Sequence, residues 1–179
     1  MYLHPMSISH AGVVDVPVLV ALLNSAYRGE ASKKGWTTEA DLLEGDIRTY
    51  EATVTELMQT PGAVFLKKVN GRNEIEGCVF LQKKENRLYL GMLSVSPKLQ
   101  AMGTGKQLMN AAILHAKEQD CHSIFMKVIS VRYELIAWYE KQGFHKTGKT
   151  ELFPDDNRFG IPKQPLFFEI MEKIIRDQT

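Results

Sequence analysis

The sequence predicts a single α+β domain built on a mixed β-sheet, on the basis of three observations. Three strand-like segments follow one another between residues 63 and 95, separated by turn residues, as in an antiparallel meander. After them come a glycine-containing loop, a helix, a strand, a second helix and further extended segments, an order typical of the α+β class. The 179 residues contain no internal repeat or linker, so we expect one domain over residues 1–179.

The first segments predict a short strand and a helix. Ser7–His10 alternates weakly, as a short strand does. Asp15 precedes Pro17, which is typical of an acidic cap followed by a proline in the first turn of a helix. The apolar stripe of this helix consists of Val18, Leu22 and Ala26, with Leu19 and Leu23 beside them. We expect the helix to end at Tyr27–Gly29.

Two further helices are predicted before the meander. Thr38 and Asp41 have the spacing of a capping box and predict a short helix over Glu39–Leu43. A longer helix is expected from about Tyr50 to Met58, and Pro61-Gly62 ends the pattern.

The meander consists of three predicted strands, Ala63–Val69, Ile75–Lys83 and Leu88–Val95. Asn70-Gly71 marks the first turn because both positions tolerate a positive φ, and Glu85-Asn86 marks the second. Pro97 cannot donate to a ladder and ends the third strand.

Beyond Pro97 the pattern predicts two helices between strands. The first helix has an apolar stripe of Leu108, Ala112 and Ala116, flanked by Met109 and Ile113. Ser123–Ile129 is a predicted strand, Tyr133–Lys141 a helix capped by Gln142-Gly143, and Phe144 begins another extended segment. The last predicted strand is Leu166–Ile175.

Charge and hydropathy exclude two classes of partner. With 22 basic and 21 acidic residues, the net charge is +1, and no basic face large enough for phosphate-backbone binding is expected. The longest apolar run, Val16–Leu23, contains a proline and is far shorter than the ~20 residues of a membrane span. The N-terminus lacks the basic region and cleavage site of a signal peptide. We therefore expect a cytoplasmic protein that binds neither nucleic acid nor membrane.

Cysteines and histidines give no sign of a disulfide or a metal site. Cys78 lies in a strand-like apolar run and Cys121 just before another, which favours two buried, reduced thiols. The histidines show no His-x-x-x-His pair and no clustering with cysteine, so no metal is expected. They are His4, His10, His115, His122 and His145.

The loop between the third strand and the following helix carries a phosphate-binding pattern. Amides that open a helix have no intrahelical partner, and Gly103 and Gly105 let a ligand approach the main chain closely. A dinucleotide fingerprint would need a third glycine where Leu108 stands, and a P-loop would need Ser or Thr where Gln107 stands. Gln100–Gly105 does match a pyrophosphate loop of the form Gln/Arg-x-x-Gly-x-Gly/Ala; an ordinary glycine turn is the alternative.

A second motif, Trp138–Phe144, follows one strand and one helix later and matches aromatic-Tyr-x-x-x-Gly-Phe. Together the two motifs resemble the GNAT superfamily of acyl-CoA-dependent N-acyltransferases, and the order of elements agrees over nearly the whole chain. The resemblance implies a mainly antiparallel central sheet flanked by helices. It also implies acetyl-CoA as co-substrate.

The resemblance assigns the cofactor-binding segment. Main-chain groups of Leu93, Ser94 and Val95 would hold the acyl and pantetheine parts of CoA, and the Leu93 N–H would donate to the thioester carbonyl. The loop that would wrap the pyrophosphate comprises Gln100, Ala101, Met102, Gly103, Thr104, Gly105 and Lys106.

Tyr139 matches the family tyrosine whose hydroxyl lies near the CoA sulfur. It would act as general acid or only as a hydrogen-bond donor, since a tyrosine pKa of about 10 exceeds the thiol's 8.5. Packing on its helix is the alternative. Arg132 stands where many members carry Asn, and Leu135 where many carry a small residue. Arg132 would then contact a CoA phosphate or face solvent.

Residues 27–48 lie where this superfamily builds its acceptor site. The candidate substrate residues there are Arg28, Trp36, Thr37 and Arg48. Two arginines beside an indole suit a carboxylate-bearing or small polar acceptor, although a helix-end arginine and a packed tryptophan explain them equally. The loop over residues 153–162 carries Asp155 and Asp156 and would favour a cationic amine instead.

The proton of the attacking amine needs an acceptor. The candidates are Glu30, Glu39, Asp41 or a water chain, and nothing in the spacing selects one.

The sequence therefore predicts an N-acetyltransferase that moves an acetyl group from acetyl-CoA to a primary amine of a small molecule or peptide. Direct attack in a ternary complex is expected because no cysteine lies in the motifs. A catalytically silent CoA-binding sensor and a transferase of longer acyl chains are the alternatives. The sequence leaves open whether the protein is a homodimer.

Overall fold

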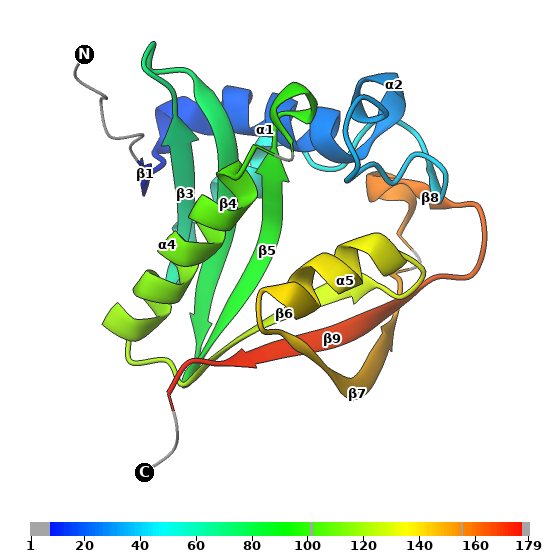
Figure 1. The fold of residues 1–179 in the computed structure, drawn as a ribbon. Coiled ribbons are helices and arrows are strands. Elements are labelled where there is room, and N and C mark those ends of the chain that lie inside the picture. Colours follow the sequence, from blue (N-terminus) through cyan, green and yellow to red (C-terminus); the bar gives the residue numbers. More distant parts are fainter. Residues whose placement is uncertain (1–7, 101, 155, 177–179) are drawn as a thin grey trace.

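The computed structural model describes residues 8–100, 102–154 and 156–176. Figure 1 shows how its helices and strands are arranged. The first half contains β1 (Ile8–His10), α1 (Val16–Tyr27), α2 (Gly29–Ser32), β2 (Leu43–Glu44), α3 (Glu51–Gln59), β3 (Ala63–Val69), β4 (Ile75–Lys84) and β5 (Arg87–Val95). The second half contains α4 (Thr104–Glu118), β6 (Ser123–Ile129), α5 (Tyr133–Lys141), β7 (His145–Leu152), β8 (Ile161–Pro162) and β9 (Phe167–Ile174). Ser7, Ala101 and Asp155 lie outside the described residues.

Seven strands form one sheet in the order β1-β3-β4-β5-β6-β9-β7, and β2 pairs with β8 in a separate two-stranded sheet. All pairings in the large sheet are antiparallel except that between β5 and β6. The parallel pairing joins only Arg87–Tyr89 to Ser123–Phe125, after which the two strands diverge (Figure 1). The sheet is therefore mixed and mainly antiparallel, as predicted, and it is open between the far ends of β5 and β6.

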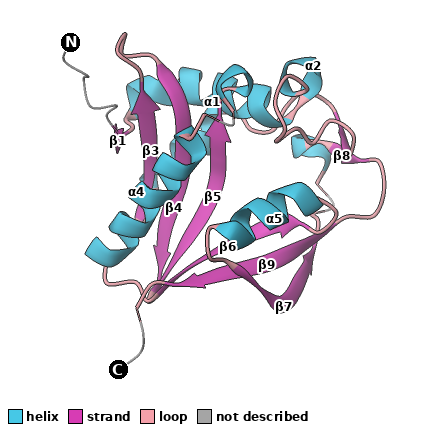
Figure 2. Cartoon of the chain, viewed as in Figure 1, coloured by secondary structure: helices cyan, strands magenta, loops and turns pink. Residues whose placement is uncertain are grey.

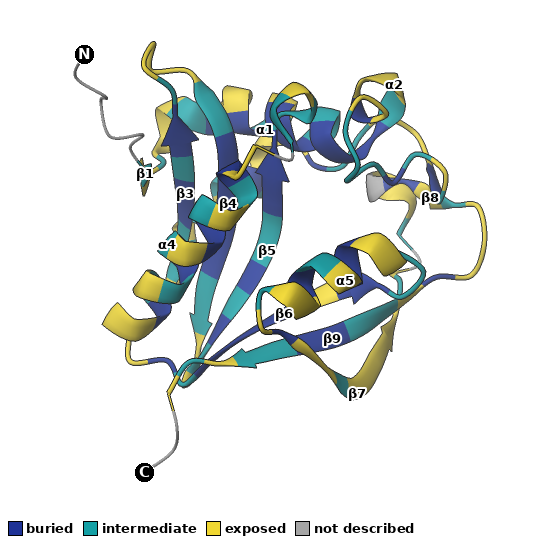
Figure 3. Ribbon diagram, in the orientation of Figure 1, coloured by how far each residue is buried: buried dark blue, intermediate teal, exposed yellow. Residues whose placement is uncertain are grey.

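Helices cover both faces of the sheet (Figure 2). α1 contacts β4 and β5 and α3 contacts β3, whereas α4 contacts β3, β4, β5 and β6. Neighbouring strand residues divide between the two layers, as the period of two requires: Phe65 belongs to the core cluster that includes residues of α1, and Leu66 belongs to the cluster that includes residues of α4. β7, at the edge of the sheet, is largely exposed (Figure 3). Across the described ranges, no helix is long and apolar enough to cross a membrane.

β3, β6 and α5 begin and end where the sequence predicts, and most other elements agree within two residues. The predicted short helix over Glu39–Leu43 is wrong. Leu42 and Leu43 donate their N–H groups to the carbonyl of Glu39 in a turn, and the chain continues into β2. Leu43 is buried with Ile129 and Leu166. Tertiary contacts therefore outweigh the local capping signal.

Two predictions about α1 also need correction. Val18 is 49% exposed, because the buried stripe runs through Leu19, Leu22 and Leu23 and Val18 lies one residue off it. Asp15 occupies the N-cap position, but its carboxylate accepts hydrogen bonds from the Gly12 N–H and from Lys67 instead of capping α1.

The β3–β4 hairpin forms at the predicted place by a different turn. The residue with positive φ is Asn73 (62°), not Asn70 or Gly71. The side-chain oxygen of Asn70 accepts hydrogen bonds from the N–H groups of Arg72 and Glu74 and so closes the loop.

Candidate active site

β5 carries a bulge next to the opening in the sheet. Phe80 pairs with Gly91 and Cys78 with Ser94, so Met92 and Leu93 together stand opposite the single residue between. Met92 has a positive φ of 52°. Since pairing with β6 ends at Tyr89, the edge of β5 beyond it faces the opening. Leu93, Ser94 and Val95 lie on this part of β5, and their role in binding a ligand stays a prediction.

The N-terminus of α4 adjoins this strand. Gly103 is its N-cap residue with a left-handed φ of 87° and, as a glycine, has no side chain with which to cap the helix. The first bond to the cap is donated by Gln107 N–H to the Gly103 carbonyl (3.1 Å), so the three preceding amides lack helical acceptors. A Cβ on Gly103 would meet nothing within 4 Å, which shows that the loop is open in front of it. These amides can bind an anion.

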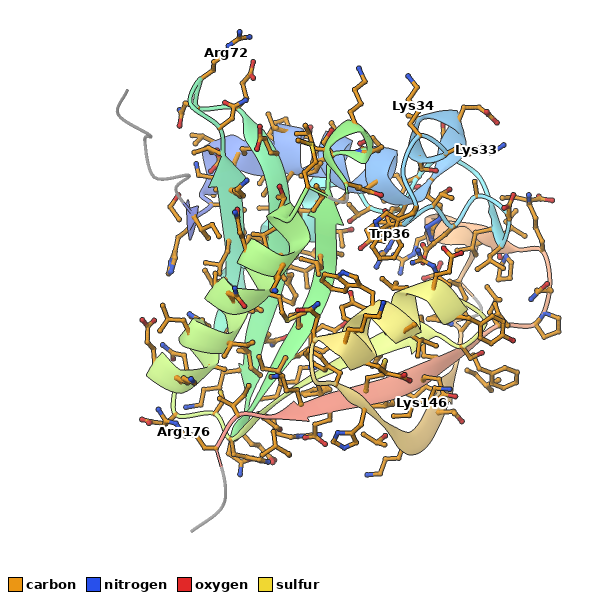
Figure 4. The ribbon with its side chains drawn as sticks, in the orientation of Figure 1. Lys33, Lys34, Trp36, Arg72, Lys146 and Arg176 are labelled. Carbon is orange, nitrogen blue, oxygen red and sulfur yellow. The ribbon has the colours of Figure 1, made fainter. Side chains whose placement is uncertain are left out.

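A cavity of about 330 Å³, the larger cavity, runs from this helix start to α5. Its lining includes Leu93, Val95, Gln100, Gly103, Gly105, Lys106, Trp138 and Tyr139. Trp36 and Thr37 also line it. Trp36 lies against α5, with its ring centroid 6.2 Å from that of Trp138 (Figure 4). The larger cavity therefore joins both sequence motifs in one apolar channel with an amide-rich end.

Gln100 holds one wall of the larger cavity with its side chain. Its Oε1 accepts from the N–H groups of Trp36 (2.8 Å) and Thr37 (3.3 Å). Its Nε2 donates to Thr37 Oγ1 (2.7 Å) and to the Val95 carbonyl (3.0 Å). Both ends of the amide are thus used within the protein. Gln100 therefore also connects β5 to the segment around Trp36 and Thr37, a structural role that the motif alone did not indicate.

A second cavity of about 120 Å³, the smaller cavity, lies beside the first. Tyr27, Leu93, Leu135 and Tyr139 line both cavities and form the wall between them. Tyr139 is 6% exposed, and burial raises the pKa of its phenol well above the ordinary 10.0, so the hydroxyl stays protonated.

Tyr27 is a site residue that the sequence did not reveal. Its hydroxyl donates a hydrogen bond to the Leu93 carbonyl, and burial raises the pKa of this phenol too. A tyrosine one turn after Leu23 simply continues the buried stripe of α1, so only the partner of its hydroxyl identifies it.

Polar residues of the smaller cavity centre on Glu39. Its Oε1 lies 3.0 Å from Arg28 Nη1 and its Oε2 lies 3.4 Å from Arg132 Nη1. All three side chains are at most 10% exposed. Of the three carboxylates considered as base, only Glu39 lines a cavity between β5 and β6, since Glu30 is an exposed partner of Lys33 and Asp41 is exposed.

Arg132 faces neither solvent nor the larger cavity. Its Nη2 donates to the Thr37 carbonyl (2.5 Å), and its Nη1 pairs with Glu39. Arg132 therefore connects the segment around Thr37 to α5 at the smaller cavity. Of the two alternatives for Arg132, exposure to solvent is wrong, because a buried carboxylate from a distant segment engages it.

The four predicted substrate residues are separated by the structure. Trp36 and Thr37 line the larger cavity, Arg48 lines the smaller cavity, and Arg28 is buried against Glu39. In the 153–162 loop, Asp156 pairs with Arg158 (2.6 Å), so its charge is compensated locally.

Both cysteines are free and buried, as predicted, and burial raises the pKa of Cys78 to about 12. Cys78 and Cys121 line neither cavity. Among the residues with described positions, no three His, Cys, Asp or Glu side chains gather as metal ligands would.

Known proteins share this fold. The ribosomal-protein-S18-alanine N-acetyltransferase of Escherichia coli has 16% identity and a TM-score of 0.71, over 97% of this chain and 96% of that one. The ribosomal-protein-alanine N-acetyltransferase of Brucella melitensis has 20% identity and a TM-score of 0.67, over 94% and 99%. The yncA protein of Salmonella typhimurium, solved with its cofactor acetyl-CoA, has 16% identity and a TM-score of 0.70, over 98% and 97%.

At these identities the structural likeness establishes the fold alone. No curated protein matches the sequence. The sequence profile of the acetyltransferase (GNAT) family, however, matches residues 21–144, which is more than half of the chain and includes both motifs. The chain therefore belongs to the acetyltransferase (GNAT) family.

Proposed function

We propose that the protein transfers an acetyl group from acetyl-CoA to a primary amine by direct attack within a ternary complex. The observation that carries this proposal is the pair of cavities that meet at one wall on the diverging strands β5 and β6. Substrates bound in the two cavities would meet at the same wall, beside Leu93 and Tyr139.

The larger cavity suits acetyl-CoA, which supplies an acetyl group activated as a thioester. The uncapped amides that open α4 match a diphosphate, because a helix N-terminus favours negative charge. The open edge of β5 offers main-chain partners to the amides of the pantetheine arm. The Trp36 and Trp138 rings supply apolar walls. The acetyl-CoA in the Salmonella relative is consistent with this assignment.

Two groups of the chain act on the reacting atoms, and a third helps to position one of them. The Leu93 N–H donates to the thioester oxygen as negative charge develops there; such a fixed donor is worth about 3 kcal/mol in other acyl-transfer enzymes. Tyr27 holds the adjoining peptide group in place through the Leu93 carbonyl. Tyr139 donates its hydroxyl hydrogen to the departing sulfur.

Full proton transfer from Tyr139 is favourable only where the cavity also destabilises the thiolate. Burial raises the pKa of the phenol, but the same apolar surroundings penalise a thiolate.

The absence of a cysteine from the linings of both cavities supports direct attack. Glu39 is a poor base because two arginines hold its two oxygens. We therefore assign the amine proton to water in the smaller cavity, the fourth candidate from the sequence.

The test is thiol release from acetyl-CoA over a panel of primary amines, together with calorimetry of acetyl-CoA binding. Binding with turnover on at least one amine supports the proposal. Tight binding with no turnover on any amine supports the sensor, and preference for propionyl- or succinyl-CoA over acetyl-CoA supports the longer-chain transferase. No heat from either CoA or acetyl-CoA overturns the assignment of the larger cavity.

A further inference from the structure

The lining of the smaller cavity has more basic than acidic side chains. Arg48, Arg132 and Lys127 line it, and among described lining residues Glu39 is the one carboxylate. Lys127 pairs with Glu151 at 2.7 Å, so its charge is compensated outside the cavity. The positive charge that remains to be explained is that of the two arginines.

Glu39 cannot neutralise both of these arginines. One of its oxygens pairs with Arg28 and the other with Arg132. In the part of the chain that the structure describes, no acidic side chain forms an ion pair with Arg48. A half-buried guanidinium without a carboxylate is an anion site that the protein itself leaves open.

Arg48 is also held in place before any ligand arrives. The side-chain oxygen of Asn24 accepts from the N–H groups of Arg48 (2.6 Å) and Thr49 (3.0 Å), and its Nδ2 donates to the Thr49 carbonyl (3.3 Å). This clamp fixes the main chain at Arg48 to α1. A fixed main chain lowers the entropy cost of binding through this side chain.

The two guanidinium groups converge on the wall between the cavities. The Cζ atoms of Arg48 and Arg132 each lie 6.0 Å from the ring centroid of Tyr27. Tyr27 in turn binds the Leu93 carbonyl. The positive charge is therefore one side chain away from the proposed position of the acetyl group.

Resting on the proposed function, we infer that the acceptor is a small amine that also carries a carboxylate, as α-amino acids do, and that Arg48 binds this carboxylate. The planar guanidinium forms two parallel hydrogen bonds with a carboxylate, which fixes the acceptor's orientation as well as its charge. A cavity of about 120 Å³ fits a compact molecule. A polyamine or a lysine side chain would bring like charge to Arg48.

The test compares acids with their amides. Glycine, alanine, methionine and phenylalanine are assayed by thiol release, each as the free amino acid and as the carboxamide, with the parent protein and with Arg48→Gln. We expect the parent to prefer the free acids, and Arg48→Gln to raise the KM for them at least about tenfold, because a charge-assisted pair is lost. The KM for the amides should stay within about twofold.

Arg72→Gln is the matched control, since Arg72 lies at the tip of the β3–β4 hairpin, away from both cavities (Figure 4). It removes the same charge and should leave the acid-to-amide ratio unchanged. Arg48→Lys keeps the charge without the fork geometry and should recover only part of the preference. Thermal unfolding of each variant checks that it is folded.

A second readout does not depend on turnover. Calorimetry of the CoA-loaded protein with the N-acetyl acids and N-acetyl amides of the same four compounds reports carboxylate binding directly. Equal affinity for acids and amides, or an equal loss of both in Arg48→Gln, overturns the inference. Failure of the proposed function has a different signature: the protein binds CoA but releases no thiol from acetyl-CoA with any amine, whatever the acid-to-amide ratio in the binding experiment.

Discussion

The two cavities beside β5 are built by opposite means. Six of the thirteen described residues that line the larger cavity come from one continuous segment, Leu93 to Lys106, and the polar groups proposed to bind the cofactor there belong to its main chain. The smaller cavity takes its polar groups from side chains of separate segments, such as Glu39, Arg48 and Arg132. Main-chain binding needs glycines at particular places and tolerates change elsewhere, whereas side-chain binding depends on each residue. A cofactor that many family members share suits a site made of main-chain groups. A substrate particular to this chain suits a site made of side chains.

The largest effect expected from this difference is that of Glu39→Gln. It removes the carboxylate that Arg28 and Arg132 share and leaves the buried charge of Arg132 without its partner. We expect the free energy of unfolding to fall by about 3 kcal/mol, as for other broken buried pairs. Urea denaturation measures this change.

Acetyl-CoA affinity should change little in Glu39→Gln, because the main-chain groups of the larger cavity are untouched. The control is Glu30→Gln, which removes an exposed ion pair with Lys33 and should leave stability unchanged. A loss of acetyl-CoA affinity in the folded Glu39→Gln protein would contradict the separation of the two cavities.

Tyr139→Phe probes the wall between the cavities. It keeps the ring that packs against Trp138 and Phe144 and removes only the hydroxyl. We expect kcat to fall about a hundredfold, as when a single donor or acid is lost, with the Kd for acetyl-CoA within about threefold of the parent value. Steady-state kinetics and calorimetry provide the two numbers. A kcat equal to the parent's would remove Tyr139 from the mechanism.

Gly103→Val probes the main-chain side of the comparison. A β-branched residue at a φ of 87° is strained, so the loop before α4 must shift. The amides that open α4 then no longer point toward the diphosphate. We expect the Kd for acetyl-CoA to rise at least about tenfold, or ~1.4 kcal/mol, by calorimetry.

Gly148→Val is its matched control. Gly148 has a φ of 84° and, like Gly103, open space where a Cβ would stand, but it lies in β7 and lines neither cavity. The same strain there should lower stability without changing acetyl-CoA affinity. Equal effects of the two substitutions on affinity would mean that strain, and not ligand approach, explains Gly103→Val.

The same contrast explains what the sequence could predict. The strands of the large sheet, α4, α5 and the two motifs that line the larger cavity follow from patterns within a few residues: alternation, a helical stripe, and the spacing of residues around Gly103 and Tyr139. Main-chain sites have local signatures because their geometry is local. The family profile, which matches residues 21–144, includes both motifs.

The smaller cavity had no such signature. Arg132 and Glu39 are 93 residues apart, and nothing in the sequence pairs them. Proximity in sequence also grouped Trp36 and Thr37 with Arg48, whereas Gln100 fixes the first two on the other side of the wall. The predicted helix at Glu39 was wrong for the same reason, since partners distant in sequence determine this segment.

The smallest effect concerns an ion pair outside both cavities, between Lys67 and Asp15 (2.9 Å). Burial alone would raise the pKa of Asp15, but hydrogen bonds from Lys67 and Gly12 outweigh it and hold the pKa below the ordinary 3.8. A carboxyl whose pKa is lower in the folded state stabilises the protein above its unfolded pKa, and this contribution is lost as the pH falls through the folded value. Asp15→Asn should therefore cost no more than about 1 kcal/mol at pH 7, and the difference from the parent should shrink below pH 3.8. Urea denaturation between pH 7 and pH 3 measures both.

Asp15→Asn and Glu39→Gln make the same chemical change, from a carboxylate to a carboxamide. If both substitutions lower the free energy of unfolding equally at pH 7, the sharing of the buried Glu39 carboxylate by two arginines does not set the stability of the smaller cavity.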